Sequence, residues 1–192
     1  MQNTKEKILL TALELFASRG YEAVSVSDIA GALGMTKGAL YRHFESKQAI
    51  FETILRRMEQ RDTELAEEDN VPLEGEESQA SLDDIISFSK SMLSYWTEDP
   101  FARAFRQMLT IEQYRCAELN ALYHQYLGSG PVEYVSMLLS ALGYAEAEQM
   151  ARSLYGVMHL CFTLCDASAQ PERERETAAE LLDAMGRIWK NG

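Results

Sequence analysis

Apolar residues recur along most of the chain at the three- and four-residue spacing of a helix surface. One such stripe near the start consists of Ile8, Leu9, Leu13, Phe16 and Ala17. Gly20 follows it as a stop signal, and the same pattern returns at 50–58, 82–96, 135–142 and 181–189. No segment shows sustained alternation of apolar and polar residues with hairpin turn chemistry. The pattern therefore predicts an all-α protein.

One break in composition separates the predicted helices into two groups. Residues 67–78 carry Pro72 and Gly75, are strongly acidic and lack a helical stripe. Such a segment is typical of an exposed linker or loop between two helical parts.

The sequence GYEAVSVSDIAGALGMTKGALYRHFESKQAIF, which begins at Gly20, contains the start and stop signals of short helices. Ser25 with Asp28 three residues later predicts a capping box, and Gly34 supplies the left-handed residue that ends this helix. Thr36 is placed to cap a second helix and Ser46 a third. Two short helices joined by a tight turn that contains glycine form a helix-turn-helix unit.

In such a unit the first residues of the second helix meet base edges in the major groove of DNA. Lys37 can donate to guanine acceptors, and Gly38 lacks the bulk that would hold the backbone away from DNA. Arg42 and His43 follow as donors for phosphate oxygens, and Tyr41 adds a hydroxyl group. Exposed charges at a helix start add little stability, so Lys37 and Arg42 are the best candidates for contacts.

The segment GMTKGALYRHFESKQAIF resembles the DNA-binding signature of TetR-type (tetracycline-repressor-like) transcriptional regulators. The resemblance implies a three-helix DNA-binding domain at 1–60, a helical effector-binding and dimerisation domain at 61–192, and a homodimer on a pseudo-palindromic double-stranded DNA operator. Carried over by position, the DNA contacts are Ser25, Ser27, Thr36, Lys37, Gly38, Tyr41, Arg42, His43 and Lys47. Ser25 and Thr36 also serve as helix caps whether or not DNA is present.

The resemblance further implies a small-molecule effector, and the second part of the chain is rich in aromatic residues and methionine. Residues of this kind that are candidates to line a largely apolar pocket are Phe88, Met92, Trp96, Phe105, Met108, Tyr123, Met158, His159 and Phe162. Plain core packing is the alternative for each, and His159 is equally explained as a satisfied core histidine.

The predicted helix at 147–166 is apolar on nearly every face and must therefore be covered on every side. Together with the final helix, at 172–190, it resembles the pair through which family members form a homodimer. The alternative is a central position within the monomer.

Three cysteines without a CxxC spacing suit the reduced thiols of a cytoplasmic protein. Cys161 and Cys165 lie four residues apart on one helical face, where packing is the main interpretation and a redox switch the alternative. We expect no metal, no cofactor and no catalytic residue, because the sequence lacks the motifs of hydrolases and phosphate-binding enzymes. No uncharged run is long enough to span a membrane.

The 192 residues carry a net charge of −12, from 18 Lys and Arg against 30 Asp and Glu. Residues 1–60 hold 8 basic and 7 acidic side chains, and residues 61–192 hold 10 and 23. The acidic total therefore belongs to the second part of the chain, and the N-terminal part is the favoured surface for DNA.

Overall fold

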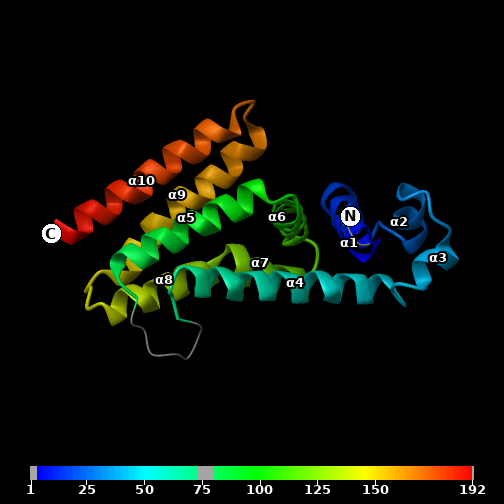
Figure 1. Cartoon of the computed structure of the whole chain (residues 1–192), viewed down its shortest axis with the longest axis horizontal. Coiled ribbons are helices and arrows are strands. Elements are labelled where there is room, and N and C mark those ends of the chain that lie inside the picture. The colour runs from blue at the N-terminus through cyan, green and yellow to red at the C-terminus, as the bar shows by residue number, and fades with distance from the viewer. Residues whose placement is uncertain (1–3, 73–79, 192) are drawn as a thin grey trace. The chain divides into compact units, whose positions relative to one another are not determined.

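The computed structural model describes residues 4–72 and 80–191, which form helices and no strand (Figure 1). The helices are α1 (Thr4–Arg19), α2 (Val26–Ala32), α3 (Lys37–Tyr41), α4 (Lys47–Glu68), α5 (Leu82–Glu98), α6 (Pro100–Glu112), α7 (Ala117–Leu127), α8 (Ser129–Ala141), α9 (Ala147–Ala167) and α10 (Pro171–Asn191). The predicted all-α class is confirmed.

The helices group into two compact units. One unit contains the chain up to Arg61 together with Pro100–Tyr123, and the other contains Asp62–Asp99 and the chain from His124 onward. Helix α6 thus belongs with the N-terminal helices, although it follows the predicted boundary at residue 60. The division into domains at that boundary stays a prediction.

Helices α1 and α6 pack along one another in the first unit. Ile8 and Phe16 of α1 and Phe105 and Met108 of α6 are all completely buried. These residues recur at helical spacing, so each helix presents one apolar stripe to the other.

A polar contact joins α4 to the same pair of helices. The Arg57 guanidinium of α4 pairs with the Glu6 carboxylate of α1 and lies 4.0 Å from the centre of the Phe101 ring of α6. This cation–π contact lets a charged side chain cover apolar surface beside the core.

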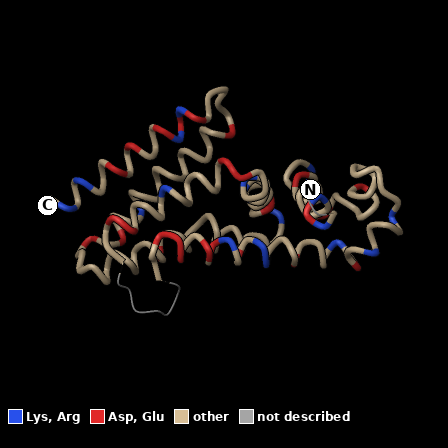
Figure 2. The backbone as a smooth tube through the Cα atoms, viewed as in Figure 1, with Lys and Arg blue, Asp and Glu red and all other residues tan. Residues whose placement is uncertain are grey.

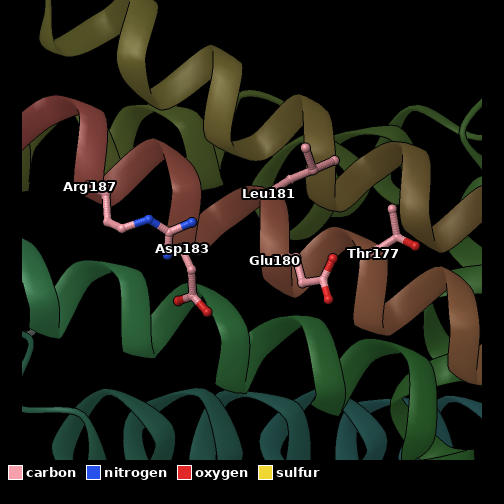
Figure 3. A pocket seen from close by; sticks show the side chains of 5 residues that line it. All are labelled: Thr177, Glu180, Leu181, Asp183 and Arg187. Atoms are coloured by element: carbon pink, nitrogen blue, oxygen red, sulfur yellow. The ribbon is translucent and has the colours of Figure 1, made fainter.

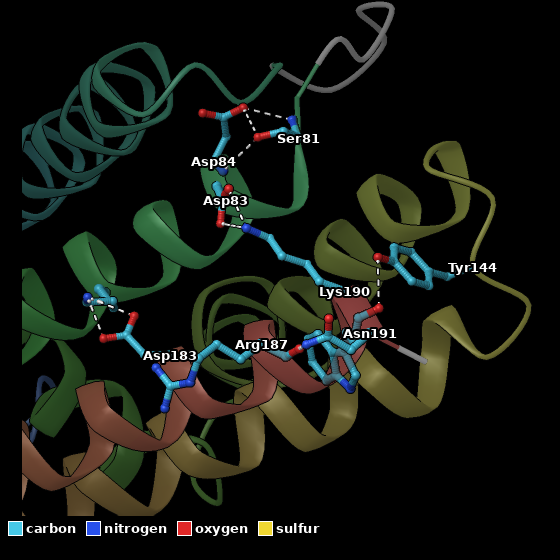
Figure 4. A network of polar contacts seen from close by, with 10 residues as sticks. Ser81, Asp83, Asp84, Tyr144, Asp183, Arg187, Lys190 and Asn191 are labelled. Atoms are coloured by element: carbon cyan, nitrogen blue, oxygen red, sulfur yellow. Dashed lines mark hydrogen bonds and ion pairs between the residues drawn. The ribbon is translucent and has the colours of Figure 1, made fainter.

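In the second unit α9 packs against α8 and α10, and α10 also packs against α5. A Cβ atom on Gly186 would lie 3.0 Å from Cγ1 of Ile86, so α5 and α10 approach closely there. Two ion pairs flank this crossing. Lys90 pairs with Asp183 at 3.0 Å. Lys190 pairs with Asp83 at 2.6 Å (Figure 4).

The acidic segment predicted as a linker lies between α4 and α5. Helix α4 extends to Glu68, and Val71 is buried just after it. The Tyr134 hydroxyl donates to the Pro72 carbonyl at 2.6 Å. Residues 73–79 of the predicted linker lie outside the described residues.

Glycine is required at the end of α1. Gly20 has a φ of +89°, and a Cβ there would lie 2.6 Å from both Oε1 of Glu112 and Nη1 of Arg115. Gly34 has a φ of +63° but open space around it. The two positions share a left-handed backbone and differ in what surrounds them.

We predict that Gly20→Ala lowers the free energy of unfolding of the first unit by about 2–4 kcal/mol, because backbone strain and a displaced carboxylate add together. The matched variant Gly34→Ala carries only the backbone strain and should cost about 1–2 kcal/mol. Urea unfolding of both variants measures the difference, and equal losses would contradict the contact between Gly20 and Glu112.

Candidate nucleic-acid interface

The start of α2 is held by a complete capping box. The Asp28 backbone N–H donates to Oγ of Ser25 at 3.2 Å, and the Ser25 backbone N–H donates to the Asp28 carboxylate at 2.8 Å. The Ser25 hydroxyl donates to the same carboxylate. These hydrogen bonds from the Ser25 side chain and backbone lower the pKa of Asp28. The predicted capping box is confirmed.

The turn between α2 and α3 is a Schellman motif around Gly34. The Met35 N–H donates to the Ala30 carbonyl at 2.8 Å, and the Gly34 N–H donates to the Gly31 carbonyl at 3.1 Å. This pattern ends α2 at the predicted residue and turns the chain directly into α3.

Helix α3 has only five residues, too few to be stable in isolation. The Thr36 hydroxyl caps it by accepting the Ala39 N–H at 3.1 Å. Leu40 is completely buried and anchors the helix to the core. Packing and a cap therefore hold α3 in place and leave its other side to solvent.

The exposed side of α3 carries the residues predicted to contact DNA. Lys37, Gly38 and Arg42 are exposed, and Tyr41 is 43% exposed. The Lys37 ammonium lies 5.8 Å from the centre of the Tyr41 ring. Arg42 forms no ion pair with any residue in the described part of the chain. His43 is half-buried, so its ring is less accessible than its neighbours.

Gly38 has no structural reason within the described chain to be glycine. A Cβ atom there would meet nothing within 4 Å, and its φ lies outside the left-handed range. Glycine costs a helix about 1 kcal/mol relative to alanine. The contact of Gly38 with DNA stays a prediction.

Lys47, predicted to bind phosphate, is already engaged inside the first unit. Its ammonium donates to the Tyr21 carbonyl at 2.8 Å and lies 4.2 Å from the centre of the Tyr21 ring. Glu22 is 3.9 Å away. Burial, reinforced by the charges of Glu22 and Glu52, raises the pKa of Tyr21. The structure thus gives Lys47 a structural role, and its contact with DNA stays a prediction.

Ser25, Ser27 and Thr36 are exposed at the starts of α2 and α3. One polar residue near this site was missed by the sequence analysis. Glu112, at the end of α6, accepts the Tyr21 N–H although 91 residues separate the two. No local pattern could have indicated a pairing at that separation.

The predicted ligand residues are divided between the two units. Phe105, Met108 and Tyr123 belong to the first unit, and the other six belong to the second. Phe88, Trp96, Met158 and Phe162 are buried and Met92 is half-buried. His159 is exposed on α9, so its interpretation as a core histidine is wrong.

A hollow of about 380 Å³ lies on α10 and includes none of the predicted ligand residues. Its lining residues are Thr177, Glu180, Leu181, Asp183 and Arg187 (Figure 3). These are mainly polar side chains, unlike the largely apolar lining of most small-molecule sites.

The two cysteines of α9 lie with their sulfur atoms 3.6 Å apart. Burial, with a hydrogen bond to Cys165, raises the pKa of Cys161 to about 12. A thiol with so high a pKa stays protonated and is a poor nucleophile, which favours packing over redox chemistry. The described residues contain no group of three or more side chains suited to a metal ion.

None of the helices in the described part of the chain is long and apolar enough to cross a membrane.

Together these elements define a helix-turn-helix protein with a second helical unit. Residues 8–54 match the model of the family described as bacterial regulatory proteins, tetR family. This N-terminal segment is therefore similar to the tetR family of bacterial regulatory proteins, in the region where the motif predicted the resemblance.

Two curated relatives are similar to this chain over about a quarter of its length. The chain is 44% identical over 50 residues to the uncharacterized HTH-type transcriptional regulator YerO of Bacillus subtilis. These 50 residues make up 26% of this chain and 17% of that protein. It is 46% identical over 52 residues to the HTH-type transcriptional repressor KstR2 of Rhodococcus jostii, 27% of this chain and 26% of that protein. The matches thus span only about a sixth to a quarter of these relatives.

Similarity in fold extends over nearly the whole chain. A transcriptional regulator from Aquifex aeolicus gives a TM-score of 0.68 at 20% identity, with 95% of this chain and 99% of that chain covered. The TetR family transcriptional regulator PfmR from Thermus thermophilus gives 0.63 at 25% identity, with 94% and 97% covered. The second unit therefore also has the fold of these regulators.

We predict that Ser25→Ala raises the pKa of Asp28 part of the way toward the ordinary aspartate value, because the hydrogen bond from the Ser25 hydroxyl to the carboxylate is lost while the one from the Ser25 backbone N–H remains. A lowered folded-state pKa contributes stability above the unfolded-state pKa, about 3.9, and this contribution disappears as the pH falls through the folded-state value. Carboxyl NMR titration of both proteins measures the shift. An unchanged Asp28 pKa in the variant would show that the Ser25 hydroxyl is not a cause of the lowered value.

Proposed function

We propose that this chain is a cytoplasmic transcriptional regulator that binds a pseudo-palindromic DNA operator as a homodimer. It acts as a repressor that a small-molecule effector releases. The observation that carries this proposal is the exposed side of α3, where Lys37, Gly38, Tyr41 and Arg42 lie on a short helix held by a cap and one buried leucine. No enzymatic activity is part of the proposal.

The chemistry of this surface fits the major groove of DNA. Lys37 stands at the first position of α3, where a recognition helix reaches base edges. Its ammonium can donate to O6 and N7 of guanine. Arg42, at the end of the same helix, suits a phosphate oxygen, and Gly38 leaves room for the sugar–phosphate backbone.

The charge distribution supports the same surface. Lys and Arg nearly balance Asp and Glu in residues 1–60, at 8 against 7, whereas residues 61–192 hold 10 against 23. Figure 2 shows both kinds of charge along the chain. DNA repels the acidic part, so the helix-turn-helix surface is the favoured contact. A small basic surface gives modest affinity that falls steeply as salt rises.

The proposed homodimer uses α9 and α10. Leu160 of α9 and Ile188 of α10 are 58% and 67% exposed in the single chain, and Leu164 and Leu181 are also exposed. On each helix these residues follow helical spacing, so each presents an apolar stripe to solvent. A second copy of the chain would cover them, and two-fold symmetry suits the two half-sites of an operator.

The effector would bind in the second unit, among apolar side chains that lie buried in the single chain, which are Phe88, Trp96, Met158 and Phe162. It would favour a dimer in which the two recognition helices are wrongly spaced for successive grooves. The competing proposal is a regulator controlled by a protein partner. Thermal-shift screening of the full chain against apolar and cationic metabolites separates the two.

We predict that Lys37→Ala weakens binding to DNA selected from a random library by about 1–3 kcal/mol and relaxes the preference at one base pair. Arg42→Ala should weaken binding to all sequences alike and reduce the slope of log affinity against log salt by about 1. Fluorescence anisotropy at several salt concentrations measures both. Arg103→Ala, which removes an exposed charge from α6 of the same unit, is the control. Unchanged affinity in both α3 variants would refute the placement of the recognition helix.

We predict that Ile188→Glu or Leu160→Glu converts the dimer to a folded monomer, because a buried carboxylate at the interface lacks a partner whereas in the monomer it is hydrated. Size-exclusion chromatography with light scattering measures the mass, and circular dichroism checks the fold. Met137→Glu, on an exposed position of α8, is the matched control and should stay dimeric. A dimer that survives both changes would place the interface elsewhere.

A further inference from the structure

Helix α6 ends in a buried carboxylate that faces the helix-turn-helix segment of its own unit. The Glu112 side chain is only 3% exposed. Its Oε1 accepts the Tyr21 backbone N–H at 3.0 Å, and Nη1 of Arg115 lies 3.4 Å from the same oxygen. A carboxylate this deeply buried is stable only with such partners.

Tyr21, which Glu112 holds, connects three helices through separate groups. Its carbonyl accepts the Lys47 ammonium at 2.8 Å, and its hydroxyl donates to Oε1 of Gln48 at 3.1 Å. Its ring lies 5.0 Å, centre to centre, from the rings of both Phe16 and Phe51. One residue thus joins the end of α1 and the start of α4 to the end of α6.

The backbone at this turn is shaped to admit the carboxylate. A Cβ on Gly20 would lie 2.6 Å from Oε1 of Glu112, so only glycine leaves the oxygen its position beside the Tyr21 N–H. The φ of +89° at Gly20 turns the chain out of α1 at the same point. The contact therefore depends on both the glycine at position 20 and the carboxylate of Glu112.

The position of this turn matters for the residues that face DNA. Tyr21 lies between α1 and the Ser25 cap of α2, and its carbonyl also holds Lys47, the first residue of α4. A shift of Tyr21 therefore moves the supports on both sides of α3. Hydrogen bonds to charged acceptors are stronger than neutral ones, and a buried N–H left without a partner is costly.

We propose that Glu112 is a positioning residue for DNA binding, which acts through Tyr21 and Lys47 on the helix-turn-helix segment. The DNA-binding surface is then complete only with α6, a helix that lies outside the family motif. This inference rests on the proposed function. It requires neither an effector nor a particular operator sequence.

The sign of the effect distinguishes positioning from simple electrostatics. Removing a negative charge from a DNA-binding protein ordinarily strengthens its attraction to phosphate. Positioning predicts the opposite for Glu112→Ala, a loss of affinity for selected DNA of roughly tenfold. The slope of log affinity against log salt should stay unchanged, because no phosphate contact is removed.

The test compares Glu112→Ala and Glu112→Gln in the full chain with Glu118→Gln, which removes an exposed charge from α7 of the same unit. Glutamine keeps an oxygen that can accept the Tyr21 N–H, so it should restore affinity to within about threefold of the unchanged chain. Glu118→Gln should bind equally well or slightly more tightly. In parallel, hydrogen exchange at the Tyr21 amide should accelerate in the alanine variant and stay slow in the glutamine variant.

The two readouts separate this inference from the proposed function. If the unchanged chain binds no DNA in the selection, the proposed function fails while the Tyr21 amide still reports on the contact. If the unchanged chain binds and Glu112→Ala binds as tightly or more tightly, the positioning role is overturned. Unaltered exchange at Tyr21 in Glu112→Ala overturns it as well. If Glu112→Ala does not fold, Glu112→Asp replaces it, because the aspartate side chain is one methylene shorter. Reduced DNA affinity or faster exchange of the Tyr21 amide in folded Glu112→Asp supports the positioning role. Unchanged values of both overturn it.

Discussion

Burial of α1 against α6 is the interaction on which the first unit depends. Phe16 and Phe105 are both completely buried, and they lie in segments separated by almost half of the chain. Short helices such as α2 and α3 cannot persist without a core to pack on. Ile29 and Leu40 are completely buried, and α2 packs against both α1 and α3.

The same dependence explains how so short a recognition helix can be precise. The Thr36 hydroxyl accepts a backbone N–H at the start of α3, and buried Leu40 fixes the orientation of the helix. The exposed side chains of α3 are therefore not needed to hold it in place. Lys47, in contrast, is held by the Tyr21 carbonyl and ring. Residues of similar charge within one motif thus divide into those that build the surface and those that are available to a partner.

In the second unit, α10 packs closely on α5, while α9 and α10 also expose apolar side chains to solvent. Gly186 lets α10 approach Ile86 of α5, and ion pairs on both sides of this point fix the register. Large apolar side chains of α9 and α10 are exposed to solvent, namely Leu160, Leu164, Leu181 and Ile188. Large exposed apolar surfaces of this kind mark interaction sites, which is why a second copy of the chain is the proposed partner.

Local patterns of residues were enough to predict the helical class, the capping box of Ser25 and Asp28, the turn at Gly34 and the cap at Thr36. Each of these depends on residues within about five positions of one another, so a linear pattern is enough to predict it. Four other outcomes depend on packing between segments far apart in the chain, which no local spacing encodes. Helix α6 joins the N-terminal unit, and Glu112 accepts the Tyr21 N–H. The Lys47 ammonium donates to the Tyr21 carbonyl, and His159 is exposed.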